Sequence, residues 1–266
     1  MRTALTIAGS DSGAGAGIQA DLKTFAAHGV YGTCAITAVT AQNSLGVTMV
    51  EAVSADLVTA QIEAVVSDFG AHAAKTGMLA NAAIVEAVAA AVRDLEIPLL
   101  VVDPVMSAKS GAQLLDEEAL AAMKAELIRQ AFLVTPNIPE AETLSGVEIR
   151  TNEDLREAAR RIVALGPTAV VITGGHVPSP HITDVLFSQG EFVEFPQTRA
   201  TGRHTHGTGC TFAAAITAHL ALGHSLREAI PRVQRYIAGA IRHAPGLGRG
   251  QGPMDHFFNF EVQSEE

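Results

Sequence analysis

Short runs of apolar and β-branched residues alternate along the chain with longer stretches in which apolar residues recur every three or four positions. The short runs are typical of buried strands, and the longer stretches are typical of helices that bury one face. Strands are expected at residues 4–8, 32–39, 73–76, 99–102, 132–135, 169–172, 184–187 and 192–196. Helices are expected at residues 17–28, 55–68, 81–95, 117–127, 140–144, 152–165, 210–222 and 226–242. This alternation predicts an α/β protein whose central, mostly parallel sheet is flanked by helices on both faces.

The last two strands follow a different pattern, because no helix separates them. Between them lie Ser188, Gln189 and Gly190, which together form a turn signal. We therefore expect a β-hairpin near one edge of the sheet. The chain contains no internal repeat, low-complexity block or linker, so a single domain is predicted at residues 1–260, followed by a frayed tail at residues 261–266.

Composition narrows the classes of protein to which the chain could belong. Its 266 residues are 48% hydrophobic, which is enough for a large core. The formal net charge of −10 disfavours binding to nucleic acid or to acidic membranes. Apolar runs are interrupted by charges, the N-terminus lacks the layout of a signal peptide, and the two cysteines suit free thiols. These features predict a cytoplasmic protein without a membrane span.

Polar, glycine-rich or carboxylate residues follow six of the predicted strands. In open α/β sheets, ligands bind beyond the carboxyl ends of the strands. Ordinary connecting loops have a similar composition, so each segment means little alone. Together they predict one large site at one edge of the sheet. The segments are residues 9–17, 40–43, 77–78, 103–106, 136–140 and 173–176.

The segment at residues 205–211 carries the most specific signal. It reads Thr-His-Gly-Thr-Gly-Cys-Thr and leads directly into an alanine-rich helix. Glycines there free the backbone to present consecutive amides, and the helix dipole favours an anion in front of them. Cys210 at the helix start is expected to have a lowered thiol pKa and to serve as a base. The alternative interpretation is an ordinary tight turn followed by a buried, structural cysteine.

Other motifs are less specific. The glycine loop at residues 13–17 fits neither the dinucleotide fingerprint nor the P-loop, so it could be a plain turn or a substrate loop. Asp103 and Glu140 follow buried strands and are candidates for Mg²⁺, although Glu140 could equally be an acid favoured by a helix N-terminus. His204 and His206 form an H-x-H pair, but no further ligands have zinc spacing, so zinc is not predicted.

Taken in order, the motifs resemble one known family. They lie at residues 8–24, 75–78, 103–106, 135–141, 205–211 and 248–257. Their combination is similar to the hydroxymethylpyrimidine/phosphomethylpyrimidine kinases of thiamine biosynthesis, a branch of the ribokinase-like superfamily. The resemblance implies a ribokinase-like fold and ATP-dependent phosphorylation of 4-amino-5-hydroxymethyl-2-methylpyrimidine to its monophosphate and then to its diphosphate. ATP and Mg²⁺ are the implied cofactors.

The resemblance also implies roles for individual residues. The backbone amides of the anion hole and the proton acceptor would be provided by Gly207, Thr208, Gly209 and Cys210. The substrate would be bound by Gly9, Ala16, Asp21, Gln42, Met78 and Val105, with the Gln42 amide reading the aminopyrimidine edge. ATP would be met by Asn137, Thr173, Gly175 and Thr208. Mg²⁺ would be organised by Asp103 and Glu140, beside Asn137.

Two alternatives and two departures accompany the resemblance. Some bacterial pyridoxal kinases share most of these motifs, and Gln42 is the position that favours the pyrimidine. A ligand sensor without turnover is the second alternative. Ala14 and Thr173 stand where the family usually has glycine and lysine. Relatives often form dimers, so a homodimer with a contact at the hairpin edge is also expected.

Overall fold

The computed structural model describes residues 1–107, 115–174 and 180–260. Within these residues one mixed sheet has the strand order β3-β2-β1-β4-β5-β6-β7-β8-β9. Neighbouring strands in the run β2-β1-β4-β5-β6-β7 pair in parallel. The remaining strands, β3 at one edge and β8 and β9 at the other, join by antiparallel pairing. The strand bounds are β1 Thr3–Asp11, β2 Tyr31–Asn43, β3 Gly46–Ala52, β4 Ala73–Thr76, β5 Leu100–Val102, β6 Leu133–Val134, β7 Ala169–Ile172, β8 His181–Ser188 and β9 Glu191–Thr198.

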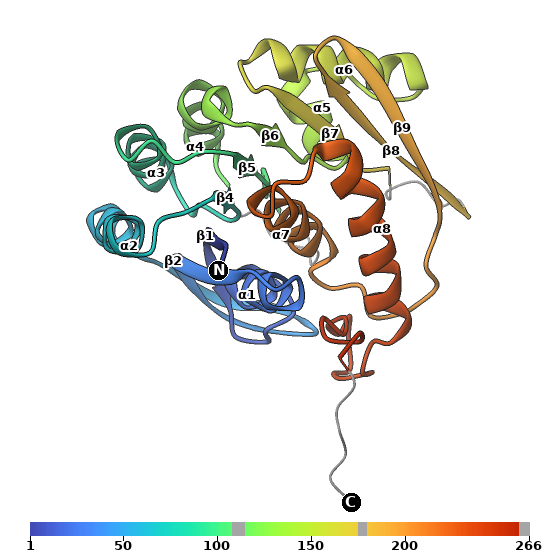
Figure 1. Cartoon of the computed structure of the whole chain (residues 1–266), viewed down its shortest axis with the longest axis horizontal. Helices are drawn as coiled ribbons and strands as arrows, with labels where there is room; N and C mark the ends of the chain where they lie inside the picture. Colours follow the sequence, from blue (N-terminus) through green and yellow to red (C-terminus); the bar gives the residue numbers. More distant parts are fainter. Residues whose placement is uncertain (108–114, 175–179, 261–266) are drawn as a thin grey trace, which may run out of the picture.

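Helices cover both faces of the sheet (Figure 1). On one face lie α1, α7 and α8, and on the other lie α2 to α6. The helices are α1 Gly17–Ala27, α2 Ala55–Asp68, α3 Ala82–Asp94, α4 Glu117–Ala122, α5 Ile138–Ser145, α6 Asn152–Ala164, α7 Thr208–Ala221 and α8 Leu226–Arg242. A π-helical turn, Met123–Leu127, and a short 3₁₀ turn, Ile128–Gln130, continue α4. The α/β fold expected from the sequence, a mostly parallel sheet with helices on both faces, is confirmed.

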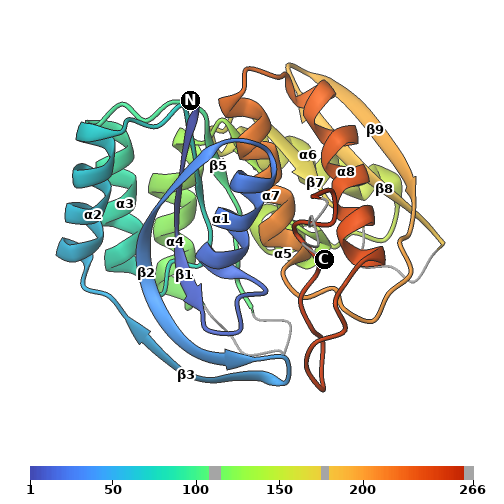
Figure 2. The same ribbon diagram turned by 60° about the horizontal axis from the view of Figure 1, so that its bottom comes forward.

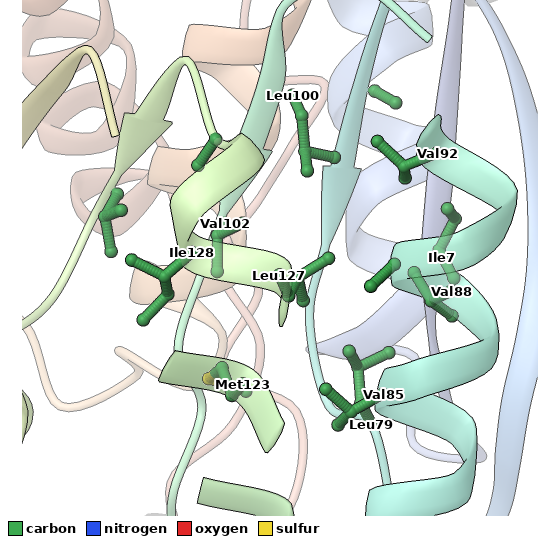
Figure 3. Packing of buried hydrophobic residues seen from close by; sticks show 14 of the residues in the cluster. Ile7, Leu79, Val85, Val88, Val92, Leu100, Val102, Met123, Leu127 and Ile128 are labelled. Carbon is green, nitrogen blue, oxygen red and sulfur yellow. The ribbon is translucent and has the colours of Figure 1, made fainter. Parts of the chain in front are cut away.

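Two hydrophobic cores lie on opposite faces of the sheet. Successive strand residues point to opposite faces, so Val170 and Ile172 join one core while Ala169 and Val171 join the other. Figure 3 shows part of the first core, where Ile7 and Leu100 from the sheet pack with Val88 from α3. The second core packs the almost wholly buried α7 between the sheet and α8. These cores hold the strand ends, and the loops that follow them, in fixed positions.

All eight predicted strands and all eight predicted helices are present, with small shifts at their ends. The predicted hairpin is formed by β8 and β9 at one edge of the sheet. The sequence pattern missed β3, and it gave one continuous helix where α4 passes into the π-helical turn. Figure 2 shows β2 curving away from the sheet to form an arm with β3.

Two further expectations concern residues 261–266 and the absence of a membrane span. The tail at residues 261–266, predicted to be frayed, lies outside the described residues. In the part of the chain that the structure describes, no helix combines the length and apolar character needed to cross a membrane.

Candidate active site

A cavity of about 830 Å³ opens at the carboxyl ends of the parallel strands. Its lining includes residues at or just beyond the carboxyl ends of β1, β2, β4, β5, β6 and β7 and the start of α7. The predicted site residues that line it are Gly9, Ala16, Gln42, Met78, Asp103, Val105, Asn137, Glu140, Thr173, Gly207, Thr208, Gly209 and Cys210. Gly175 lies outside the described residues. The cavity therefore collects almost the whole predicted set.

The start of α7 has the geometry of an anion hole. Gly207 is the N-cap of this 14-residue helix and has a φ of 82°, in the left-handed region. A Cβ atom built there would lie 1.8 Å from the carbonyl oxygen of Gly15, so only glycine fits. Thr208 donates a side-chain hydrogen bond to the carbonyl of Thr205 at 2.7 Å, which fixes the turn. The first amides of α7 thus face the cavity, where the helix dipole favours an anion.

Cys210 lies at the cavity in the first turn of α7, but its thiol is not activated in the way expected from the sequence. Burial raises the pKa of the thiol to about 12, and the charges of Asp103 and Asp21 act in the same direction. Lys75 and an amide hydrogen bond from Gly17 oppose this rise without cancelling it. The side chain keeps some surface open to the cavity, yet protein surrounds it closely. The expectation of a lowered thiol pKa is therefore wrong for the protein alone, because desolvation outweighs the helix dipole.

Asp21 does not line the cavity, which corrects the role expected for it as a pocket wall. Its side chain is fully buried and forms an ion pair with Lys75, with 2.9 Å between Oδ2 and Nζ. The Thr6 hydroxyl donates to the same oxygen at 2.6 Å. Asp21 holds Lys75 in place, and it is Lys75 that reaches the cavity. Burial would lower the pKa of Lys75, but the charges of Asp21, Cys210 and Asp103 raise it, so the ammonium stays protonated.

Asp103 and Glu140 form a pair of buried carboxyl groups. Burial raises the pKa of Asp103 to about 6, while burial and the charge of Asp103 together raise that of Glu140 to about 8. Glu140 and Asn137 also form a capping box at the start of α5, with bonds of 2.9 and 3.0 Å. Glu140 is therefore also an acid at a helix N-terminus, as the alternative interpretation of the sequence had it.

The same pair fits a hard cation. Asp103 Oδ2 is buried and has no hydrogen-bond partner, and two carboxyl groups whose charges repel are stabilised by a cation between them. Among the described residues no group of three or more acidic, histidine or cysteine side chains is arranged to hold a metal by itself. Mg²⁺ commonly binds one or two carboxylates and takes its other ligands from phosphate and water. The donor set therefore suits Mg²⁺ that arrives with a phosphorylated ligand.

Gln42 belongs to a hydrogen-bonded group that the sequence analysis missed. Its side-chain amide lies 3.2 Å from Nε2 of His206, and that nitrogen lies 3.0 Å from Oδ2 of Asp11. His206 had been considered only as a zinc ligand, and Asp11 only as part of a loop. The H-x-H pair and the acid before the glycine loop were visible in the sequence, but their contact joins residues 195 positions apart.

The other end of the cavity contains a second missed acid, Asp184 on β8. Its carboxylate accepts hydrogen bonds from the backbone amide of Gly174 at 3.0 Å and from the side-chain amides of Gln197 and Gln234 at 3.2 and 2.8 Å. Burial raises the pKa of Asp184, although the bonds from Gln234 and Gly174 counteract this rise. This group fixes the backbone beside Thr173 at the end of the cavity expected to meet ATP.

The segment at residues 248–253 does not line the cavity, but it contacts residues that do. The amide of His206 donates to the carbonyl of Gly252 at 3.2 Å, and the amide of Gly252 donates to Nδ1 of His204 at 3.0 Å. Gly250 donates through its amide to the hydroxyl of Ser44, in the turn between β2 and β3, at 3.2 Å. The segment therefore joins the turn beyond Gln42 to the anion hole.

Comparisons with known proteins agree with this geometry. Residues 11–255 match the family model described as phosphomethylpyrimidine kinase. The hydroxymethylpyrimidine/phosphomethylpyrimidine kinase of Bacillus subtilis is 48% identical over 96% of this chain and 94% of its own. The thiamine biosynthesis bifunctional protein ThiED of Geobacter sulfurreducens is 50% identical over 97% of this chain, which spans only 52% of that relative.

Solved structures show the same architecture. Pyridoxal kinase of Bacillus subtilis, in a crystal structure with ADP, is 40% identical to this chain and superposes with a TM-score of 0.89. The match covers 96% of this chain and 97% of that one.

Proposed function

The chain belongs to the phosphomethylpyrimidine kinase family, and we propose that it phosphorylates 4-amino-5-hydroxymethyl-2-methylpyrimidine with ATP, first to the monophosphate and then to the diphosphate. One observation carries this reaction: the anion hole of α7, the Lys75 ammonium and the Asp103–Glu140 pair face one cavity. Phosphoryl transfer requires positioning and the stabilisation of negative charge on several oxygens. This arrangement supplies both.

Each part of the cavity has a different role in the proposed reaction. The amides at the start of α7 hold the phosphoryl group during transfer, and Lys75 adds a fixed positive charge beneath it. Gln42 binds the aminopyrimidine edge, because a carboxamide donates and accepts at once. Met78 and Val105 pack against the ring, and Thr173 meets the nucleotide at the other end of the cavity. Asp103 and Glu140 would hold Mg²⁺, which neutralises charge between the phosphates when it is bound.

Cys210 takes the proton of the substrate hydroxyl in this scheme. Its thiol must be deprotonated to do so. Lys75 is the side chain of this protein that favours the thiolate, whereas Asp103 and Asp21 disfavour it. Any charge that offsets Asp103 therefore assists Cys210, so proton transfer is expected to depend on a fully assembled site.

The test is ADP release by the purified protein with ATP and Mg²⁺, measured in parallel with hydroxymethylpyrimidine, its monophosphate and pyridoxal. We expect turnover on both pyrimidines, with pyridoxal much slower. The structural match to a pyridoxal kinase makes the third substrate necessary. A preference for pyridoxal would assign the chain to that activity, and binding without ADP release would indicate a sensor.

Further expectations concern Mg²⁺ dependence, location and assembly. Removal of Mg²⁺ with a chelator should abolish ADP release, and readdition should restore it.

The free thiols Cys34 and Cys210 are compatible with the reducing cytoplasm, which we propose as the location. The homodimer is part of the same proposal, and light scattering of the purified protein tests it.

A further inference from the structure

Asp11 anchors the glycine loop that closes one side of the cavity. Its carboxylate accepts backbone hydrogen bonds from Gly13 at 2.8 Å, from Gly15 at 3.1 Å and from Ala16 at 2.8 Å. Burial would raise the pKa of Asp11, but bonds from His206, Ala16 and Gly13 outweigh it, so the pKa is lowered. Asp11 is therefore an ionised acceptor, and whatever else contacts it must donate a hydrogen bond.

His206 is the remaining contact of Asp11, so its Nε2 must carry a proton. The distance from Nε2 to Oδ2 of Asp11 is 3.0 Å. The same nitrogen lies 3.2 Å from the Gln42 amide. A protonated Nε2 cannot accept a hydrogen bond from an amide N–H group. The Gln42 atom placed beside His206 is the amide nitrogen, but two donors cannot bond each other, so we assign the carbonyl oxygen to this side.

Thr40 leads to the same orientation from the other side of Gln42. The Thr40 hydroxyl lies 2.9 Å from the carbonyl oxygen of Ser10, to which it donates its single proton. It also lies 3.2 Å from the atom placed as Oε1 of Gln42, but one hydroxyl proton cannot serve both acceptors, and the shorter contact is the one to Ser10. We therefore assign the amide nitrogen of Gln42 to the side of Thr40, the reverse of its placement. The oxygen and nitrogen of an amide have nearly the same shape, so such neighbours decide which is which.

The position of His206 is itself fixed by close packing. A Cβ atom on Gly15 would lie 2.5 Å from Cδ2 of His206. The main-chain amide of His206 donates a hydrogen bond to the carbonyl of Gly252. The ring therefore stands against the glycine loop, one residue before the anion hole. The ring cannot move to suit a different orientation of the Gln42 amide. The position of the ring therefore determines how the amide is oriented.

We propose that Asp11 and His206 are positioning residues that set the amide orientation of Gln42 and thereby the choice of substrate. This inference rests on the proposed function. With its oxygen toward His206 and its nitrogen toward Thr40, Gln42 presents one free lone pair and one free N–H group to the substrate. The acceptor lies on the side of His206 and the donor on the side of Thr40. A ring nitrogen beside an amino group needs one donor and one acceptor in a matching order. A ligand without that pair gains nothing from the arrangement.

The kinetic test compares His206→Leu with His206→Gln. Leucine removes the donor, whereas glutamine can place an N–H group near the position of Nε2. We expect His206→Leu to raise KM for hydroxymethylpyrimidine about tenfold, the value of one ordinary hydrogen bond, with a smaller effect on kcat. The preference for pyrimidine over pyridoxal should fall by a similar factor, and His206→Gln should restore both. His243→Leu, at an exposed histidine on α8's C-terminal side, is the matched control.

A spectroscopic test separates this inference from the proposed function. Nitrogen NMR of the ¹⁵N-histidine-labelled protein reports which ring nitrogen of His206 is protonated, and it needs no substrate. We expect a proton on Nε2 in the wild-type protein. A bare Nε2 would overturn the inference even if the enzyme is active, as would unchanged KM and selectivity in a folded His206→Leu variant. Absence of turnover in the wild type would instead overturn the proposed function.

Discussion

At the residue scale, the site places several buried charges around one thiol. Burial raises the pKa of Cys210, the charges of Asp103 and Asp21 raise it further and that of Lys75 lowers it, so the thiol stays protonated in the protein alone. An isolated buried charge is costly, so each member depends on the others. The roles of these residues can therefore be separated only by comparing single and paired substitutions.

Cys210→Ala should lower kcat by about 10²- to 10⁴-fold, the usual contribution of a positioned acid or base. The fold should be retained, because alanine fits a helix start flanked by small residues. Single-turnover ADP formation measures the effect, and Cys34→Ala, on β2 away from the cavity, is the control. A near-normal kcat in the Cys210 variant would remove this residue as the proton acceptor.

Lys75→Met should reduce both activity and stability. The substitution leaves Asp21 buried without its partner, which costs about 3–5 kcal/mol. In the double variant Lys75→Met, Asp21→Leu, much of that stability should return, while kcat should stay low because the ammonium is still missing. Urea unfolding and steady-state kinetics on the three proteins distinguish the two effects. Recovery of activity together with stability would show that Lys75 is purely structural.

The sequence predicted individual site residues well when their position in the chain determined their surroundings. Residues that follow strands reached the cavity, because parallel strands deliver their carboxyl ends to one edge. Asp21 was misplaced because its partner Lys75 is 54 positions away. The thiol pKa was misjudged for a related reason. The helix dipole is a local effect that the sequence displays, whereas burial depends on the whole fold.

At the element scale, the start of α7 depends on its contact with the glycine loop. The backbone at Gly207 lies so near the carbonyl oxygen of Gly15 that a Cβ atom on Gly207 would overlap it. The two segments belong to different motifs, yet neither can shift without the other. The anion hole is therefore a property of both elements.

Gly207→Ala should abolish most activity, because the new Cβ would overlap Gly15 and alanine disfavours the left-handed φ of 82°. We expect kcat/KM to fall at least a hundredfold while far-ultraviolet circular dichroism stays close to that of the wild type. Gly223→Ala supplies the control, since Gly223 also has a positive φ but its Cβ would meet nothing within 4 Å. Equal losses in both variants would point to backbone strain and not to the overlap.

Strands with apolar residues that pack against a core were predictable, including β9 with its partly buried Phe192 and Phe195, whereas β3 was not. The missed strand β3 is partly or fully exposed along its whole length, so it lacks the apolar pattern on which the prediction relies. The π-helical turn after α4 was missed because its apolar spacing suits a continuous helix. Both features follow from tertiary contacts.

At the scale of the whole molecule, two buried histidines, His219 on α7 and His256 after α8, make stability depend on pH. Burial lowers the pKa of His219 to about 4, with the charges of His28, His224 and Arg232 acting in the same direction. Burial also lowers the pKa of His256 to about 4. The unfolded chain takes up these protons near pH 6.5, whereas the folded protein resists them until about pH 4.

The contribution of these two histidines to stability should therefore fall as the pH decreases from about 6.5 to about 4. The raised pKa values of Asp103 and Glu140 act in the opposite direction, since their folded forms bind protons more readily. Comparison of wild type with His219→Gln isolates one ring. The variant should lose less thermal stability across this range, as measured by Tm at several pH values. Parallel curves for the two proteins would contradict the role given to His219.

The contact between Gly252 and His206 has a consequence for the life of the protein in the cell. The ribosome releases the N-terminal strands first, and domains begin to fold as they emerge. The glycine loop, Gln42 and α7 are all made before the segment that braces them. A nascent or prematurely terminated chain that stops before Gly250 lacks this brace. Phosphoryl transfer should therefore begin only after the segment around Gly252 has been synthesised and has packed against His206.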